Sequence, residues 1–274
     1  LIFKVLKSYK MGKNKFTPII SIITPNYNGK KYLEKTIKSV INQSYKKIEY
    51  IIIDGNSKDG SKKIINKYKK YIDYYETKKD NGIFHAVHKG ILKSKGKYII
   101  WINSDDVLHP NAAENVAKIF NNDPNIKWIN GICGYIKKNI KFSLIPYIYP
   151  RKIILDGKAH KRFYGYIQQE STSFRRSLYI KSGGLNIKKN SGGDFFLWQK
   201  FAKITNLETF FIKIGYFRSH NKQLSANKGS FEIYTGHISN KFDFNFLRLF
   251  ISLICLPTII IKTLIRRNFK RKKN

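Results

Sequence analysis

Residues 98–106 have the sequence YIIWINSDD, an apolar run that ends in two adjacent carboxylates. A run this rich in β-branched and aromatic residues predicts a strand buried on both faces. A buried carboxylate is costly unless it is paired or holds a metal, and open α/β sheets bind ligands at strand ends. Asp105 and Asp106 therefore fit two interpretations: a divalent-metal site, or a pair that caps the helix following Pro110.

Outward from this segment, apolar runs of strand length alternate with stretches of helical spacing. The predicted strands are residues 19–24, 48–53, 72–76 and 98–102, and the predicted helices are residues 32–41, 61–71, 82–93 and 111–120. This alternation predicts βαβ units and a parallel sheet. Because crossovers are right-handed, the loops at 24–28, 54–59 and 104–106 should converge at one edge of the sheet.

The second half of the chain has a less regular pattern. We predict strands and turns over residues 127–148, an amphipathic helix over 194–203 and a strand over 207–217. The predicted fold class is α/β, an open Rossmann-like sheet with a mixed second half and a C-terminal helical tail. We predict three parts: a basic segment over residues 1–17, a main domain over 18–242, and an apolar and basic tail over 243–274.

The chain has 274 residues and a formal charge of +36. Such a charge suggests a polyanionic neighbour: nucleic acid, a membrane surface or a phosphorylated substrate. The lysines are scattered rather than gathered on one helix, so we expect no nucleic-acid partner. Cys133 and Cys255 lie far apart and outside any C-x-x-C pair, which is typical of a reducing compartment.

The tail contains a thirteen-residue apolar run, 249–261, interrupted by Pro257 and followed by six basic residues. A bilayer span needs about 20 apolar residues, so we expect this run to be too short to cross a membrane. An apolar segment beside a basic cluster predicts an interfacial anchor on an anionic membrane surface. The alternative is a core helix with a frayed basic end. We predict a cytoplasmic protein, peripheral on the inner face of the plasma membrane.

Four segments follow one another in an ordered way: residues 21–28 (SIITPNYN), 39–45 (SVINQSY), 51–61 (IIIDGNSKDGS) and 103–106 (NSDD). Together they resemble the family 2 glycosyltransferases of GT-A fold. The resemblance implies a GT-A sheet and a metal-dependent, inverting transfer of a sugar from a nucleotide-diphosphate sugar, with a UDP-sugar as the expected donor. The expected acceptor is a cell-surface glycan or a lipid-linked acceptor.

The resemblance also implies positions that contact the donor nucleotide. These are Thr24, Pro25, Tyr27, Asp54, Asp80, Gly82 and Asp105. Asp54 ends the second strand, where a carboxylate would accept the N–H of a pyrimidine base. His85 and His88 depart from the family pattern, which has Asp and Asn at these positions.

The acidic pair matches the metal-binding motif of the family. Asp106 is the expected direct ligand of Mg²⁺ or Mn²⁺, which carboxylate oxygens bind well and which would bridge the donor diphosphate. By the same resemblance, His220 is a further metal ligand or contacts the diphosphate, and Arg218 contacts the diphosphate.

Asp194 matches the catalytic base, which takes the proton of the acceptor hydroxyl in an in-line displacement. Taken alone, Asp194 would also fit a helix N-cap. The segment that contains Gln169 and Glu170 resembles the acceptor side, and Glu170 is a second candidate for the base.

Two other functions fit the sequence less well. A nucleotidyltransferase usually has a Gly-rich basic loop after its first strand, and residues 25–29 (PNYNG) lack one. A non-catalytic basic binding protein would not need the acidic residues, all of which are present.

Overall fold

The computed structural model describes residues 19–137, 140–143, 145–160, 164–187, 192–220, 223 and 245–268. The predicted basic segment 1–17 and the predicted boundary between residues 242 and 243 lie outside these ranges.

The first half of the chain alternates strands and helices, as predicted. In chain order the elements are β1 (Ile20–Asn26), α2 (Lys30–Ile41), β2 (Ile48–Asp54), α3 (Ser61–Lys67), the 3₁₀ helix η1 (Lys69–Tyr71), β3 (Tyr74–Thr77), α4 (Ile83–Lys93), β4 (Tyr98–Trp101), β5 (Val107–Leu108) and α5 (Ala112–Asn122). The helix predicted over 61–71 is thus divided. Its α-helical part ends where the N–H of Tyr68 is shared between the carbonyls of Ile64 and Ile65.

The second half contributes shorter helices and long strands. Its elements are β6 (Trp128–Lys137), β7 (Ile140–Ser143), α6 (Arg151–Leu155), the 3₁₀ helix η2 (Gln169–Ser171), β8 (Thr172–Arg175), α7 (Arg176–Lys181), α8 (Gly193–Ile204), β9 (Glu208–Arg218) and α10 (Asn245–Asn268). The strands predicted over 127–148 and 207–217, and the helix predicted over 194–203, are all confirmed.

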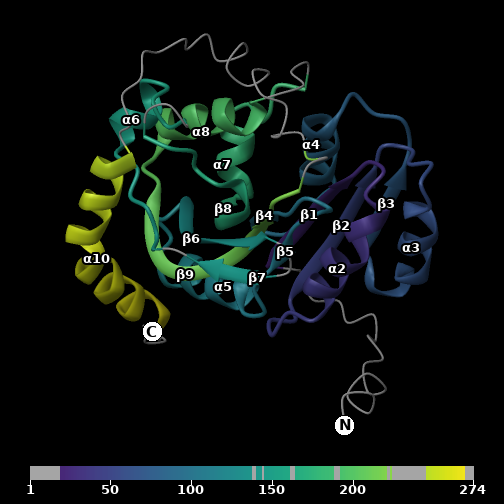
Figure 1. Cartoon of the computed structure of the whole chain (residues 1–274), viewed down its shortest axis with the longest axis horizontal. Helices are drawn as coiled ribbons and strands as arrows, with labels where there is room; N and C mark the ends of the chain where they lie inside the picture. Colours follow the sequence, from purple (N-terminus) through teal and green to yellow (C-terminus); the bar gives the residue numbers. More distant parts are fainter. Residues whose placement is uncertain are drawn as a thin grey trace.

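All of the described strands join one sheet in the order β3-β2-β1-β4-β8-β6-β9-β5, with β7 paired to β6. Strands β1 to β4 are parallel, whereas β8 runs antiparallel to both β4 and β6. Figure 1 shows the sheet curling towards its β6 and β9 side. The carboxyl ends of β1, β2 and β4 lie at one edge, where Asn26 pairs in register with Asp54.

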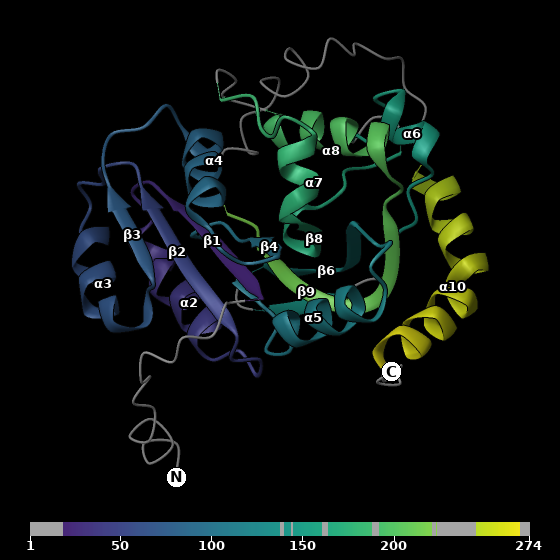
Figure 2. The ribbon, with the colours of Figure 1, turned by 180° about the vertical axis from the view of Figure 1, so that it is seen from behind.

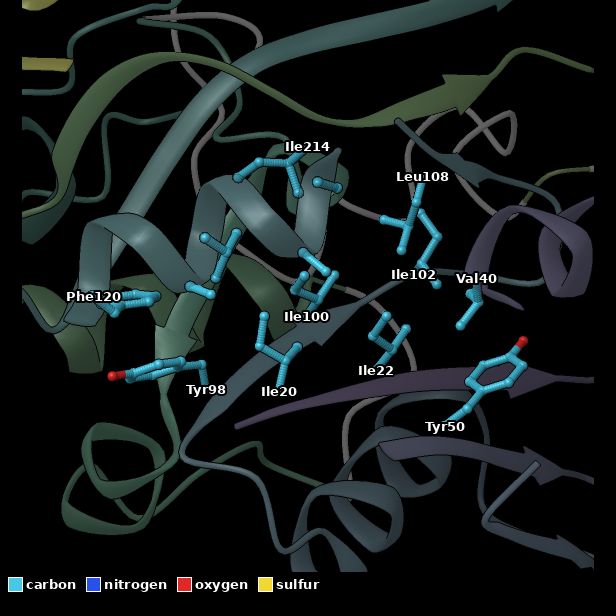
Figure 3. Packing of buried hydrophobic residues seen from close by; sticks show 14 of the residues in the cluster. Ile20, Ile22, Val40, Tyr50, Tyr98, Ile100, Ile102, Leu108, Phe120 and Ile214 are labelled. Carbon is cyan, nitrogen blue, oxygen red and sulfur yellow. The ribbon is translucent and has the colours of Figure 1, made fainter. Parts of the chain in front are cut away.

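Two apolar cores cover the two faces of the sheet. Ile20 and Ile22 of β1 pack with α2 and α5 on one face, in the cluster drawn in Figure 3. Ile23 of β1 points to the other face, where α4, α7 and α8 cover the sheet (Figure 2). All three isoleucines are fully buried, and each such side chain contributes about 1.5–3 kcal/mol. Successive side chains of β1 therefore point to opposite faces of the sheet, and the strand contributes to both cores.

Helix α10 confirms the predicted C-terminal helical tail. It runs through Pro257 and contains a 19-residue stretch, Leu249–Arg267, that is long and apolar enough to cross a membrane by length and composition. This stretch is longer than the thirteen-residue apolar run, 249–261, that was expected to be too short to cross a membrane. An internal proline removes one helical hydrogen bond, and here the helix nevertheless continues through it into the basic end.

Candidate active site

The structure brings four acidic side chains together at the carboxyl edge of the sheet. Asp105 and Asp106 lie in the turn after β4, Glu170 lies in η2, and Asp194 lies in the first turn of α8. Buried Glu170 interacts directly with Asp106 and feels the negative charges of Asp105 and Asp194. Asp105 and Asp194, 89 positions apart in the sequence, therefore share one electrostatic environment.

The acidic pair does not cap a helix. Helix α5 begins at Ala112 with Asn111 as its N-cap, so Asp105 and Asp106 lie outside its first turn. The Asp106 side chain is only 1% exposed, and its Oδ1 accepts the backbone N–H of Arg218 at 2.7 Å. The Asp105 side chain keeps 29% of its surface exposed. The capping interpretation is thus wrong for this pair.

Asp106 and Glu170 form a buried pair of carboxyls. Asp106 Oδ2 and Glu170 Oε2 are both buried without a hydrogen-bond partner. Burial, followed by the charges of Glu170 and Asp105, raises the pKa of Asp106 well above its ordinary value. Burial likewise raises the pKa of Glu170 to about 7. Two such groups in contact favour either a shared proton or a bound cation.

The end of β9 holds the acidic turn in place. The Arg218 Nε donates to the Asp105 carbonyl at 2.7 Å, and the His220 Nε2 lies 2.9 Å from Asp105 Oδ2. Tyr32 of α2 packs against both, with the Arg218 guanidinium 4.8 Å from its ring centre and the His220 ring 5.0 Å away. Arg218 and His220 were both predicted as site residues, and both contact Asp105. Arg218 contacts its backbone carbonyl, and His220 contacts its carboxylate.

Sequence reasoning missed Tyr32 and Thr36, both on α2. The Thr36 hydroxyl donates towards the carbonyls of Ser104 and Asp106, at 2.9 and 2.6 Å. Thr36 is fully buried beside Leu33, Ile37 and Val40. A threonine inside an otherwise apolar helical stripe is the signal that could have revealed it, because a buried hydroxyl needs a partner.

Asp194 lies inside the first turn of α8 and is not its N-cap residue. The N-cap of α8 is Gly192, which lies in the left-handed region at φ 68°, and Asp194 is the second helical residue. Burial raises the pKa of Asp194, and the neighbouring backbone N–H groups of the helix start oppose that rise. The side chain is half-buried. The N-cap interpretation of Asp194 is therefore wrong.

A close glycine contact positions the start of α8. A Cβ on Gly193 would lie 2.6 Å from the Phe84 ring of α4, so only glycine permits this approach. Phe84 in turn packs edge-on against Trp101 of β4, with ring centres 6.1 Å apart. These contacts join β4, the strand that precedes the acidic turn, to the helix that carries Asp194.

A second glycine contact positions η2. A Cβ on Gly215 of β9 would lie 2.5 Å from the Glu170 carbonyl oxygen. The Gln169 side-chain amide donates to the carbonyl of Trp101, which ties η2 to the end of β4. Gln169 is buried, so in this structure it orients the acidic segment from within the protein.

The loop after β2 is built around Asp54. Its Oδ1 accepts from Asn26 Nδ2 at 2.6 Å and from the Ser57 hydroxyl at 2.5 Å, and its Oδ2 accepts the Ser57 N–H at 3.0 Å. Asp54 and Thr24 are fully buried, and Pro25 is buried as well. These three residues support the loop from beneath, and their contacts with a nucleotide stay a prediction.

Tyr27 is the exposed member of the predicted nucleotide-binding set, with 69% of its surface accessible. A Cβ on Gly55 would lie 3.2 Å from the Tyr27 ring and 3.1 Å from Asp80 Oδ2, so Tyr27 and Asp80 flank this glycine. Asp80 Oδ1 also accepts the N–H of Gly82, whose φ of 98° suits glycine. An exposed ring beside a carboxylate is a surface on which a base can stack and hydrogen-bond.

At the acidic pair, a metal ion would find Asp106 Oδ2, a buried oxygen without a hydrogen-bond partner, and the partly exposed carboxylate of Asp105. Within the described ranges, no group of three or more His, Cys, Asp or Glu side chains is spaced to hold an ion alone. This donor set fits Mg²⁺ or Mn²⁺ held partly by a ligand, since Mg²⁺ usually takes one or two carboxylates plus substrate phosphates.

A cavity of about 140 Å³ adjoins the acidic cluster on the β6 side. Its lining includes Cys133, Tyr135, Tyr149, Tyr166 and Ser171, the last of which follows Glu170 in the chain. Burial and the charges of Glu170 and Asp106 raise the pKa of the Cys133 thiol. The cavity is therefore within electrostatic reach of the acidic side chains.

Comparison with known proteins places this geometry in a family. Residues 21–181 match the model of glycosyl transferase family 2. An uncharacterised glycosyltransferase of Rickettsia prowazekii is 31% identical over 201 residues, which cover 72% of this chain and 63% of that protein. The poly(ribitol-phosphate) beta-N-acetylglucosaminyltransferase TarP of Staphylococcus aureus is 37% identical over 102 residues, 35% of this chain and 31% of TarP. The chain thus spans less than two thirds of the length of these relatives.

Among solved structures, TarS 1–349 of S. aureus in complex with UDP-GlcNAc aligns with a TM-score of 0.60 at 12% identity, covering 92% of this chain and 68% of that one. This likeness supports the GT-A type of open, curled sheet. Since the family match spans more than half of the sequence and includes the loops that carry Asp54, Asp105 and Asp106, the chain belongs to glycosyltransferase family 2.

Proposed function

We propose that this protein is a metal-dependent, inverting, hexosyltransferase-like enzyme that moves a sugar from a UDP-sugar to a cell-surface glycan or lipid-linked acceptor. One observation carries the proposal: Asp194 and the Asp105–Asp106 pair converge on Glu170 from different elements. An in-line displacement needs two such groups, one at the departing diphosphate and one at the incoming hydroxyl.

In this proposal the donor side is formed by Tyr27 and Asp80, with Asp54 holding their loop. The nucleotide base stacks on the exposed Tyr27 ring, which lies beside a carboxylate. Arg218 keeps the acidic turn in place through the Asp105 carbonyl and the backbone N–H to Asp106.

Asp105 and Asp106 would hold Mg²⁺ or Mn²⁺, which supplies neutralising charge to the leaving diphosphate. His220 already lies 2.9 Å from Asp105 Oδ2, so it orients that carboxylate as well as being a candidate ligand. The orphan oxygen of Asp106 supports the assignment, because a buried carboxylate oxygen without a partner is costly.

Asp194 acts as the base in this scheme. Its half-buried carboxylate accepts the proton of the acceptor hydroxyl, and its raised pKa makes it a better proton acceptor than a solvated aspartate. Glu170 is 4% exposed, which favours a role behind the reacting groups. The cavity beside Glu170 supplies room for acceptor groups on this side of the site.

The acceptor we propose is anionic and is met at the cytoplasmic face of the plasma membrane. The charge of +36 favours a polyanion, and the name of the relative TarP describes a phosphate polymer as its acceptor. The long apolar helix α10 favours a membrane location.

Thermal-shift titration with UDP-, GDP- and TDP-sugars in Mn²⁺ tests the donor, since a ligand that binds only the folded state raises the melting temperature. We expect a UDP-sugar to stabilise the protein and to be turned over. NMR of the product should show that the anomeric configuration of the transferred sugar is inverted relative to the donor. Stabilisation by a different nucleotide class would correct the donor, and a retained anomer would overturn the inverting mechanism.

A further inference from the structure

Helix α10 packs against the body of the protein through a polar face that runs along most of its length. The Ser252 hydroxyl accepts the N–H of Ile148, and the Thr263 hydroxyl accepts the N–H of Phe211 at 2.8 Å. Both side chains are buried. Phe211 lies in the part of β9 that no described strand pairs on its outer side, so α10 covers an open strand edge.

Charged contacts extend this attachment to the end of the helix. Lys262 pairs with Glu208 of β9, and Arg266 pairs with Asp123 at 2.7 Å. Asn122 of α5 also donates to the Arg266 carbonyl. Figure 1 shows α10 lying along the outer side of the sheet, beside β9. The polar contacts from Ser252 to Arg266 thus hold the helix flat on the body.

The opposite face of α10 is an apolar stripe. Its residues follow helical spacing and are each exposed: Phe250, Leu253, Ile254, Pro257, Ile261, Leu264 and Ile265. At 100° per residue these positions fall within an arc of roughly 120°, and Ser252, Ile259 and Thr263 fall on the other side. Ile254 and Ile261 keep 62% and 58% of their surface exposed. A continuous apolar stripe of this kind marks an interaction surface.

The charge around the stripe identifies its partner. None of residues 244–274 is acidic, and eight of them are Lys or Arg. The described end of the helix includes the exposed Arg267, and Lys213 of β9 is also exposed. An apolar stripe in a segment with only positive charge fits the interface of an anionic bilayer. A second copy of this chain would bring the same cations to the interface with no acidic residue in the segment to offset them.

We propose that α10 binds an anionic membrane in plane, with its apolar stripe inserted at the headgroup level and its polar face kept on the protein. The helix therefore lies on the bilayer and does not cross it. A spanning orientation would carry β9 and the end of α5 into the hydrocarbon with it, or would break the contacts of Ser252, Lys262, Thr263 and Arg266. This proposal refines the membrane location within the proposed function and does not depend on transferase activity.

Vesicle flotation of the full chain tests the proposal without donor or acceptor. The wild type should float with vesicles of phosphatidylglycerol and phosphatidylcholine, and far less with phosphatidylcholine alone. Ile254→Gln/Ile261→Gln should weaken binding about tenfold or more, because two inserted side chains become polar. The matched control is Leu92→Gln/Ile180→Gln, which changes two exposed apolar residues on α4 and α7 and should bind like the wild type.

Equal binding by the stripe variant and the control would overturn the proposal. Resistance of the bound wild type to alkaline carbonate would overturn the in-plane orientation in favour of a span. Light scattering that shows a dimer, lost in the stripe variant, together with no flotation would assign the stripe to a second copy. A UDP-dependent thermal shift in each variant verifies folding and tests the enzyme proposal separately.

Discussion

The backbone N–H of Arg218 donates a 2.7 Å hydrogen bond to Asp106 Oδ1, which joins the end of β9 to the acidic turn across 112 residues of sequence. Because the donor is a backbone group, the bond depends on the path of β9 and survives substitution of the Arg218 side chain. It leaves Asp106 Oδ2 as the one oxygen of this carboxylate without a partner among the described residues. The second half of the sheet thus determines which acidic oxygen is available for chemistry.

Replacing the proposed base should stop transfer and spare donor binding. We expect Asp194→Asn to lower kcat by about 10²–10⁴-fold, because the amide keeps the shape of the side chain but cannot accept the hydroxyl proton. The Kd of the UDP-sugar, measured by calorimetry, should stay within a factor of two or so of wild type. Asp156→Asn, which changes an exposed carboxylate at the C-cap of α6, is the control. Persistent transfer in Asp194→Asn would place the base elsewhere.

The raised pKa of Asp194 predicts the acid side of the pH–rate profile. A base must be deprotonated, so kcat/KM should be high above the folded pKa and should fall as the pH drops through it. Burial raises this pKa above its usual value of 3.8, so activity should be lost at a higher pH than for a solvated aspartate. Stopped assays at constant ionic strength and saturating Mn²⁺ measure the profile. If the residual activity of Asp194→Asn falls at low pH just as the wild-type activity does, the fall belongs to the titration of another group.

Removing divalent metal should abolish activity and adding it back should restore activity. We expect EDTA-treated protein to recover with Mg²⁺ or Mn²⁺, and Asp105→Asn or Asp106→Asn to raise the metal concentration needed by about tenfold or more. Metal titration of the initial rate provides the measurement. Full activity in chelator would remove the metal from the mechanism.

Thr36 should matter for both stability and activity. Thr36→Val keeps the shape of the side chain but leaves the carbonyls of Ser104 and Asp106 without this donor, which should lower the free energy of unfolding by about 1–3 kcal/mol. Thr36→Ser keeps the hydroxyl and should retain activity close to wild type. Urea unfolding and initial rates separate the two effects. If Val and Ser variants lose the same activity, the hydroxyl has no role in holding the turn.

The contact between Gly193 and Phe84 should set the position of Asp194. Gly193→Ala places a methyl 2.6 Å from the Phe84 ring, so the start of α8 must move and kcat should fall by about tenfold or more. In a Phe84→Ala background the same substitution should cost little further activity, because the ring it would meet is gone. Additive losses in the double variant would show that the two residues act independently.

The strands and helices of the first half could be predicted because their signals are local. The isoleucine-rich runs of β1, β2 and β4 are strand signals at any position, and the alternation with α2 and α4 implies parallel order. The loops that carry Asp54, Asp105 and Asp106 follow from that order alone. A C-terminal helix was also predicted, and α10 continues through Pro257 beyond the thirteen-residue apolar run that ends at residue 261.

The site required contacts that no local pattern contains. The burial of Asp54 and Thr24, the pairing of Asp106 with Glu170, and the approach of Gly193 to Phe84 each join segments that are distant in the chain or depend on what covers them. The presence of a glycine or a carboxylate in a sequence does not predict which atoms will surround it in the folded protein.

The sequence by itself determined the alternating strands and helices of the first half, its parallel sheet, the residue types at the carboxyl edge and the family resemblance, since these depend on apolar periodicity and on short ordered motifs. Only the tertiary structure decided which acidic oxygens are exposed, which of them meet, and which face of α10 remains apolar and open. The physical reason is that pKa, exposure and metal-binding capacity are properties of an environment, and that environment is made by side chains from β4, η2, α8 and β9 together.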